Sequence, residues 1–237
     1  NIPFVQLVTG PMSTGSFRGE RVGACTDCRR LWGDFRADRL TEDEISEAND
    51  ALVPTVGTCG VMGTASTMAL LVEALGLAPL GSATAPAVSA DRRRIAEQVG
   101  HLAVDIAKRH CHPADILTLA SFENALRVLL AVGGSTNAII HLTAMAGRLG
   151  IKLSLDRLDE LSKQTPVIVD LKPSGTGYME DLHAAGGSVR ILSALSGSLD
   201  LQAMTVTGQT LGQELSNIDI PNWPQDVIRS SKKPIYK

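Results

Sequence analysis

The 237-residue sequence has few aromatic residues, little net charge and no long apolar run. Aromatic residues form 3% of it and hydrophobic residues 44%, so mainly aliphatic side chains must supply the core. The formal net charge is −3 and no block of like charge occurs, which argues against nucleic acid as a partner. The longest apolar stretches are broken by charge, Gly or Pro, which argues against a membrane partner. We therefore expect one globular unit.

Cysteine is also scarce, and its four positions are unevenly spaced: Cys25, Cys28, Cys59 and Cys111. A chain of this length can build a core without a disulfide framework, so we expect reduced thiols and a cytoplasmic location. Cys25 and Cys28 have the spacing of zinc knuckles and redox dithiols, but no second pair completes a zinc site. A redox dithiol usually stands at the start of a helix, but residues 29–39 are rich in Arg and look more like a surface connection. A redox role for Cys25 and Cys28 is the alternative.

Both ends of the sequence predict an excised piece of a longer protein. The chain begins with Asn1 and continues at once into "IPFVQLV", a pattern typical of a buried strand. Residues 223–237 are polar, contain Pro and lose helical periodicity. We expect residues 1–222 to form part of one domain, and residues 223–237 to be a tail or linker toward a second, absent domain.

Three segments in the first half of the chain carry helix signals. Thr41 and Glu44 have the spacing of a capping box, which predicts a surface helix directly after Thr41. Residues 64–77 are apolar nearly all round and predict a buried helix that stops at Gly76. Residues 89–110 predict an amphipathic helix with these residues on its apolar side: Ile95, Val99, Leu102, Val104 and Ile106.

The second half of the chain continues the alternation of helices and apolar runs. Residues 121–134 and 135–150 predict two helices separated by Gly133 and Gly134, and residues 165–171 predict a short buried strand. Strands separated by helices, with continuous apolar runs, favour an α/β fold in which helices flank a mainly parallel sheet.

Cys59 stands in a glycine-rich turn, "GTCGVMG", directly before the predicted helix at 64–77. Backbone N–H groups and the positive end of the helix dipole favour a thiolate there, and the glycines let a bulky partner come close. Such a turn suits a nucleophile, an anion or a metal cluster. The residues alone leave open a simpler interpretation, in which Cys59 is a small buried side chain in a loop that the glycines shape.

Two polar segments interrupt the apolar second half. Ser135, Thr136 and Asn137 follow paired glycines at a helix junction and present hydroxyls and free amides that suit a carboxylate or phosphate, so we expect them to bind substrate. Residues 170–175 leave the end of the predicted strand, where open α/β sheets place ligands. Helix capping and turn chemistry explain both segments about equally well.

Three stretches, taken together, carry a resemblance to a known family: "GTCGVMGTASTMALLVEALGL", "ILTLASFENALRVLLAVGGSTNAIIHL" and "PVIVDLKPSGTGYMEDLHAAGG". In this order they resemble the dihydroxy-acid and sugar-acid dehydratase family, and the resemblance covers essentially the whole chain. Within that family, "ACTDCRRLWGDFRA" and "CGVMGTASTMA" are more similar to the pentonate (arabinonate or xylonate) dehydratases than to the enzymes of branched-chain amino-acid synthesis.

The resemblance implies an iron–sulfur-dependent hydro-lyase that converts a 2,3-dihydroxy sugar acid into a 2-keto-3-deoxy acid. Family members hold a cluster, commonly [2Fe–2S] with [4Fe–4S] as the alternative, through three cysteines, and a nearby Mg²⁺ through carboxylates and a modified lysine. The divalent ion acidifies the C2 proton of the substrate, and an iron without a fourth protein ligand accepts the departing 3-hydroxyl.

The resemblance assigns one site residue in this chain, because Cys59 matches the third cluster cysteine of the family and Cys25, Cys28 and Cys111 match none. The first two cluster cysteines and the Mg²⁺ ligands would lie outside the chain, as would the serine base. We therefore expect an internal fragment that is inactive alone, needs the missing N- and C-terminal parts and assembles as a homo-oligomer. The alternatives are a dihydroxy-acid dehydratase of branched-chain amino-acid synthesis and a non-catalytic α/β ligand-binding fragment.

Overall fold

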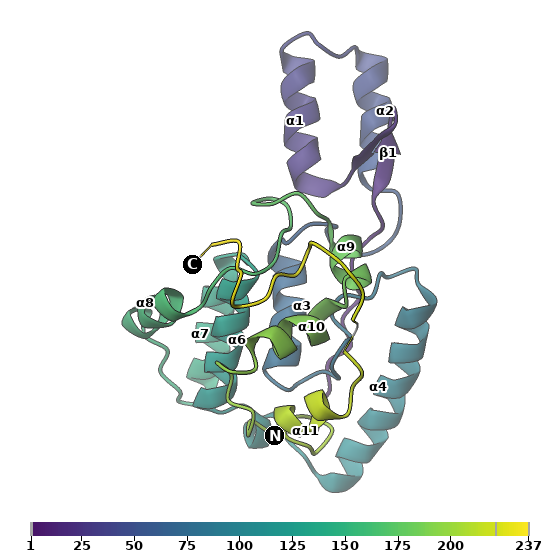
Figure 1. Cartoon of the computed structure of the whole chain (residues 1–237). Helices are drawn as coiled ribbons and strands as arrows, with labels where there is room; N and C mark the ends of the chain where they lie inside the picture. Colours follow the sequence, from purple (N-terminus) through teal and green to yellow (C-terminus); the bar gives the residue numbers. More distant parts are fainter. Residues whose placement is uncertain (1, 221, 237) are drawn as a thin grey trace.

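The computed structural model describes residues 2–220 and 222–236, and helices dominate them (Figure 1). The helices are α1 Ala24–Arg36, α2 Glu42–Leu52, α3 Thr64–Ala74, α4 Ala90–Arg109, α5 Pro113–Ile116, α6 Leu119–Ala131, α7 Asn137–Arg148, α8 Leu155–Gln164, α9 Met179–Ala184, α10 Gly187–Leu195 and α11 Leu211–Ser216. The strands of the described residues are β1 Gly15–Phe17 and β2 Glu20–Val22, which pair antiparallel with Phe17 opposite Glu20.

The expected parallel sheet is wrong, because this small antiparallel hairpin is the only sheet among the described residues. The expected first strand at residues 2–8 is not paired into a sheet; Gln6 N–H donates to Leu77 O (2.8 Å), and Ile2 is 80% exposed. A continuous apolar run does not distinguish a buried strand from a buried helix. In this chain the longest such runs form the buried helices α3 and α6.

Residues 165–171, the other expected strand, are extended but pair only at isolated positions. Val167 bridges Tyr236 and Val169 bridges Ile228, both in antiparallel orientation. Trp223 also holds this C-terminal segment, since its Nε1–H donates to Ala184 O (3.0 Å). Residues 223–236, which the sequence predicts as a tail or linker, therefore lie against the body of the chain, and Ile228 is buried there.

The main hydrophobic core surrounds α3, on which α6, α7 and α10 pack. The predicted ends of the central helices are confirmed. Gly76 follows α3 with a φ of +80°, and a Cβ atom there would lie 2.5 Å from Met204 O, so this position requires glycine. Gly133, with a φ of +58°, separates α6 from α7 as predicted.

A second, smaller core joins α1, α2 and the β1–β2 hairpin into what we call the α1–α2 unit, residues 15–52. Figure 1 shows this unit projecting beyond the other helices. The surface connection expected at residues 29–39 is wrong, because most of them form α1, whose Leu31 is buried against α2. The predicted capping box is confirmed: Thr41 Oγ1 accepts from Glu44 N–H (3.3 Å) and Glu44 Oε2 accepts from Thr41 N–H (2.7 Å).

The long helix α4 confirms the predicted amphipathic helix in part. Val99 and Ile106 are buried, whereas Val104, expected on the same side, is 57% exposed. Residues two positions apart on a helix point about 200° apart, so Val104 and Ile106 cannot face the same core. No described helix is both long enough and apolar enough to cross a membrane.

One carboxylate lies inside the main core. Glu73 of α3 is completely buried and accepts hydrogen bonds from Gly81 N–H (3.0 Å), Ser82 Oγ (3.2 Å) and Ala83 N–H. These bonds attach the loop at 81–83 to the core. Burial raises the pKa of Glu73 to about 7, because the charged form is poorly solvated there.

The raised pKa of Glu73 predicts that stability depends on pH. The folded chain binds this proton more tightly than the unfolded chain, whose glutamate pKa is near 4.5. The contribution of Glu73 to the free energy of unfolding is therefore largest below pH 4.5 and decreases as the pH rises toward about 7. The slope is at most about 1 kcal/mol per pH unit. Urea denaturation at a series of pH values should show it.

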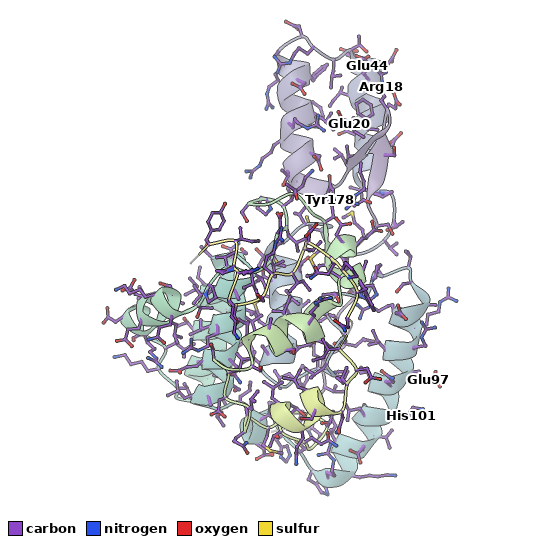
Figure 2. The ribbon with its side chains drawn as sticks, viewed as in Figure 1. Arg18, Glu20, Glu44, Glu97, His101 and Tyr178 are labelled. Carbon is purple, nitrogen blue, oxygen red and sulfur yellow. The ribbon has the colours of Figure 1, made fainter. Side chains whose placement is uncertain are left out.

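Glu73→Gln should remove this slope, since the glutamine does not titrate. The matched control is Glu97→Gln, because Figure 2 shows Glu97 on the outer side of α4, away from the core. The control should keep the slope of the unaltered chain. An equal slope in Glu73→Gln and Glu97→Gln would contradict the prediction.

Candidate functional site

Cys59 lies in a loop, residues 57–63, that is hydrogen-bonded on one side to residues 10–12. Thr58 N–H donates to Gly10 O (2.9 Å), and Met12 N–H donates to Thr58 O (2.8 Å). Gly57 has a φ of +136°, and a Cβ atom there would lie 2.4 Å from the Met12 nitrogen. Only glycine therefore lets this Cys59 loop approach residues 10–12 so closely.

The other side of the Cys59 loop is bound to two distant segments of the second half of the chain. Met62 N–H donates to Lys172 O (2.9 Å), and Met179 N–H, at the start of α9, donates to Gly60 O (2.8 Å). Ser66 of α3 also donates from Oγ to Cys59 O (3.1 Å). The backbone around Cys59 is thus fixed from three directions, while its side chain is only half-buried.

The Cys59 side chain lines a cavity of about 370 Å³, which we call the thiol cavity. Its lining residues come from α1, from the Cys59 loop and from the loop before α9: Cys25, Thr26, Arg29, Cys59, Val61, Met62, Gly63 and Pro173. Two thiols therefore share one cavity. The neighbouring Cys59, followed by burial, raises the pKa of Cys25.

Two larger hollows lie elsewhere. One of about 640 Å³ is lined by neutral residues around α11, and one of about 480 Å³ lies between α10 and residues 220–230. Neither contains a cysteine, histidine or carboxylate, so the thiol cavity is the candidate site with the chemistry that a metal group would need.

A buried charged cluster joins α1 to the loop before α9. The Asp27 carboxylate accepts hydrogen bonds from Lys172 Nζ (3.0 Å), Tyr178 Oη (2.8 Å) and Gly23 N–H (2.9 Å). Figure 2 shows Tyr178 at the base of the projecting α1–α2 unit. Burial alone would raise the pKa of Asp27, but hydrogen bonds from Tyr178 and Lys172 outweigh it and hold the pKa below its usual value.

The three residues expected to bind substrate divide between two places. Ser135 Oγ lies 2.9 Å from Thr64 Oγ1, and Asn137 Nδ2 donates to the same oxygen (3.0 Å), so both contact the first residue of α3 directly after the Cys59 loop. Thr136 lines a separate hollow of about 140 Å³ between α6, α7 and α8. Thr136 also precedes α7 without a side-chain capping bond.

The sequence model of the dihydroxy-acid/6-phosphogluconate dehydratase N-terminal family matches residues 1–214. The chain belongs to this family. It is 40% identical, over 237 residues, to a dihydroxy-acid dehydratase of Metallosphaera sedula, an alignment that covers 99% of this chain and 42% of the relative. It is 43% identical to an L-arabinonate dehydratase of Rhizobium leguminosarum bv. trifolii over 99% of this chain and 41% of the relative. The chain thus spans about two fifths of the length of these family members.

The thiol cavity offers sulfur ligands and no carboxylate oxygen. Cys25 and Cys59 supply thiols, the ligands that iron–sulfur clusters take from proteins. No group of three or more His, Cys, Asp or Glu side chains able to hold a metal ion occurs in residues 2–220 and 222–236. The cavity lining contains no carboxylate, whereas Mg²⁺ requires oxygen ligands. The lining of the thiol cavity therefore fits part of a cluster site and contains no carboxylate for Mg²⁺.

Sequence reasoning missed the residues that surround Cys59. The sequence related Cys25 only to Cys28, by their spacing, whereas in the fold Cys25 lines the thiol cavity and Cys28 packs against the smaller core. Nothing in the sequence indicated that Asp27 and Lys172 form an ion pair. One local feature was available. Asp27 is an acidic residue in the first turn of the helix at 24–36, where a negative charge favours the start of a helix.

The charged cluster predicts a large loss of stability when Lys172 is removed. Lys172→Met would leave the Asp27 carboxylate buried without its cation and should lower the free energy of unfolding by about 3 kcal/mol. Lys163→Met is the matched control, because the Lys163–Asp159 pair on α8 is exposed and its loss should not be measurable. Equal urea midpoints for the two variants would show that the buried pair does not stabilise the fold.

Proposed function

We propose that this chain carries part of the active site of an iron–sulfur-dependent hydro-lyase, which converts a sugar acid of the 2,3-dihydroxy type into a 2-keto-3-deoxy acid. The observation that carries the proposal is Cys59, a half-buried thiol on a backbone fixed from three sides and facing the thiol cavity. Membership of the dehydratase family supports it. The remaining parts of the site would belong to the longer protein.

In the proposed enzyme Cys59 is a ligand of a [2Fe–2S] cluster, with [4Fe–4S] as the alternative. When bound, the cluster supplies a Lewis acid for the departing hydroxyl group. The residues of this chain position and shield it: Val61 and Met62 form an apolar wall of the cavity, and Arg29 adds a positive charge at its edge. That charge suits an acidic substrate.

The family resemblance implies that the Mg²⁺ ligands, the serine base and the other cluster cysteines would come from the longer protein, and the lining of the thiol cavity contains no carboxylate. We propose that residues 1–222 form part of the cluster-binding domain, that residues 223–237 lead toward a second domain, and that the enzyme is a cytoplasmic homo-oligomer. The chain alone should not turn over substrate, because one cluster ligand cannot retain a cluster.

The substrate class rests on short sequence similarities. The chain is 43% identical to the L-arabinonate dehydratase and 40% identical to the dihydroxy-acid dehydratase described above, so both substrate classes have support. We favour a sugar acid because "ACTDCRRLWGDFRA" and "CGVMGTASTMA" resemble pentonate dehydratases. The second candidate is the dihydroxy acid of branched-chain amino-acid synthesis. Steady-state assays of the longer protein with both acids separate them by kcat/KM.

The proposal predicts that Cys59→Ser in the longer protein abolishes iron binding and activity while the fold is retained. A hydroxyl is a poor ligand for cluster iron compared with a thiolate. Iron and sulfide analysis, the visible spectrum and the circular dichroism spectrum measure the three properties. Cys28→Ser and Cys111→Ser are the matched controls, because these thiols pack against the two hydrophobic cores. Full iron content in Cys59→Ser would overturn the assignment.

We also propose that Ser135, Thr136 and Asn137 contribute to substrate binding. Ser135 and Asn137 are hydrogen-bonded to Thr64 at the start of α3, and exposed polar groups at a helix start suit a carboxylate. Their position next to the Cys59 loop supports the proposal. Helix-junction chemistry alone would explain the same contacts.

Thr136→Val should therefore raise KM or lower kcat several-fold in the longer protein with little loss of stability, since the side chain is exposed. Thr143→Val on the same helix α7, away from the junction, is a control of the same chemistry. Steady-state kinetics and thermal denaturation measure both effects. Unchanged kcat/KM in Thr136→Val would favour a purely structural role for this junction.

A further inference from the structure

The thiol cavity holds two thiols, and the proposed function uses only that of Cys59. Cys59 comes from the loop before α3, and Cys25 comes from the first turn of α1. Cys25 is exposed and Cys59 is half-buried, so a small molecule can reach both. We propose that Cys25 and Cys59 are a modification site: they form a reversible disulfide with each other when they react with a small-molecule disulfide such as oxidised glutathione.

The surroundings favour this pair over the other possible pairs. Cys28 is three residues from Cys25, but its side chain packs against the smaller core with Trp32 and Phe35. Cys111 packs against the main core and does not line the thiol cavity. Arg29 lines the cavity, where its charge attracts an acidic disulfide such as oxidised glutathione.

The chemistry is an ordinary thiol–disulfide exchange. One cysteine thiolate attacks oxidised glutathione, a mixed disulfide forms, and one glutathione thiolate leaves. The other cysteine thiolate then attacks the protein sulfur of the mixed disulfide, the Cys25–Cys59 bond forms, and the second glutathione thiolate leaves. The two protein thiols lose two electrons to one glutathione disulfide, and their two protons pass to the two released thiolates.

The consequence rests on the proposed function, in which Cys59 binds cluster iron. A disulfide removes the Cys59 thiolate, so the oxidised protein should not accept iron until a reductant breaks the bond. Formation of the disulfide itself depends only on the two thiols and does not require that a cluster ever binds.

The test treats the reduced 237-residue chain with oxidised glutathione, blocks the remaining thiols with iodoacetamide and maps the tryptic peptides by mass spectrometry. We expect a peptide pair joined through Cys25 and Cys59, with Cys28 and Cys111 alkylated, and we expect dithiothreitol to reverse it. Cys25 and Cys28 lie on one tryptic peptide, so Cys28→Ser makes the assignment unambiguous. Cys28→Ser and Cys111→Ser should keep the cross-link.

Cys25→Ser and Cys59→Ser should lose the cross-link and retain glutathione on the remaining thiol of the pair, with an unchanged circular dichroism spectrum. A Cys25–Cys28 bond, a stable mixed disulfide at Cys59 in the unaltered chain, or alkylation of both thiols would overturn the proposal. These results are distinguishable from failure of the proposed function. That function fails if Cys59→Ser keeps its iron in the longer protein, whether or not the disulfide forms in this chain.

Discussion

A buried carboxylate needs a cation or hydrogen-bond donors inside the protein. Asp27, which is 3% exposed, is such a carboxylate. It lies at the junction between the α1–α2 unit and the main body. Lys172 and Tyr178, both from the loop before α9, supply the compensating cation and a hydrogen-bond donor. The penalty for moving either partner away is large, so the beginning of α1 is held against this loop.

The same loop also fixes the candidate site. The side chain of Lys172 pairs with Asp27, while its carbonyl oxygen accepts the hydrogen bond from Met62 N–H in the Cys59 loop. One residue therefore contacts the segments that carry both thiols of the cavity, Cys25 through α1 and Cys59 through its loop. The ion pair that holds the start of α1, and with it Cys25, lies outside the cavity lining.

Features that depend on neighbours in the sequence were predictable. The capping box of Thr41 and Glu44, the end of α3 near Gly76 and the junction at Gly133 all follow from local chemistry. The Cys59 turn was also recognisable, because glycine spacing and the start of a helix are local. The proposed role of Cys59 as a cluster ligand came from the family resemblance, because composition and periodicity do not indicate it.

Features that depend on distant contacts were not predictable. The parallel sheet was wrong because apolar runs at 2–8 and 165–171 carry no information about whether a strand will find neighbours to pair with. Asp27 and Lys172 are 145 positions apart, and nothing in either segment indicates the other. The spacing of Cys25 and Cys28 gave no indication that α1 directs the two thiols to different surroundings.

The separate core of the α1–α2 unit has a consequence for hydrogen exchange. Its buried apolar residues number six, and they make a cluster distinct from the main core. Small cooperative units of this kind open without global unfolding, so the amides of α1 and α2 should exchange with solvent deuterium together and before those of α3 and α6. Each such opening would also carry Cys25 away from Cys59, so the lifetime of the thiol cavity depends on the smaller core as well as on the Asp27–Lys172 pair.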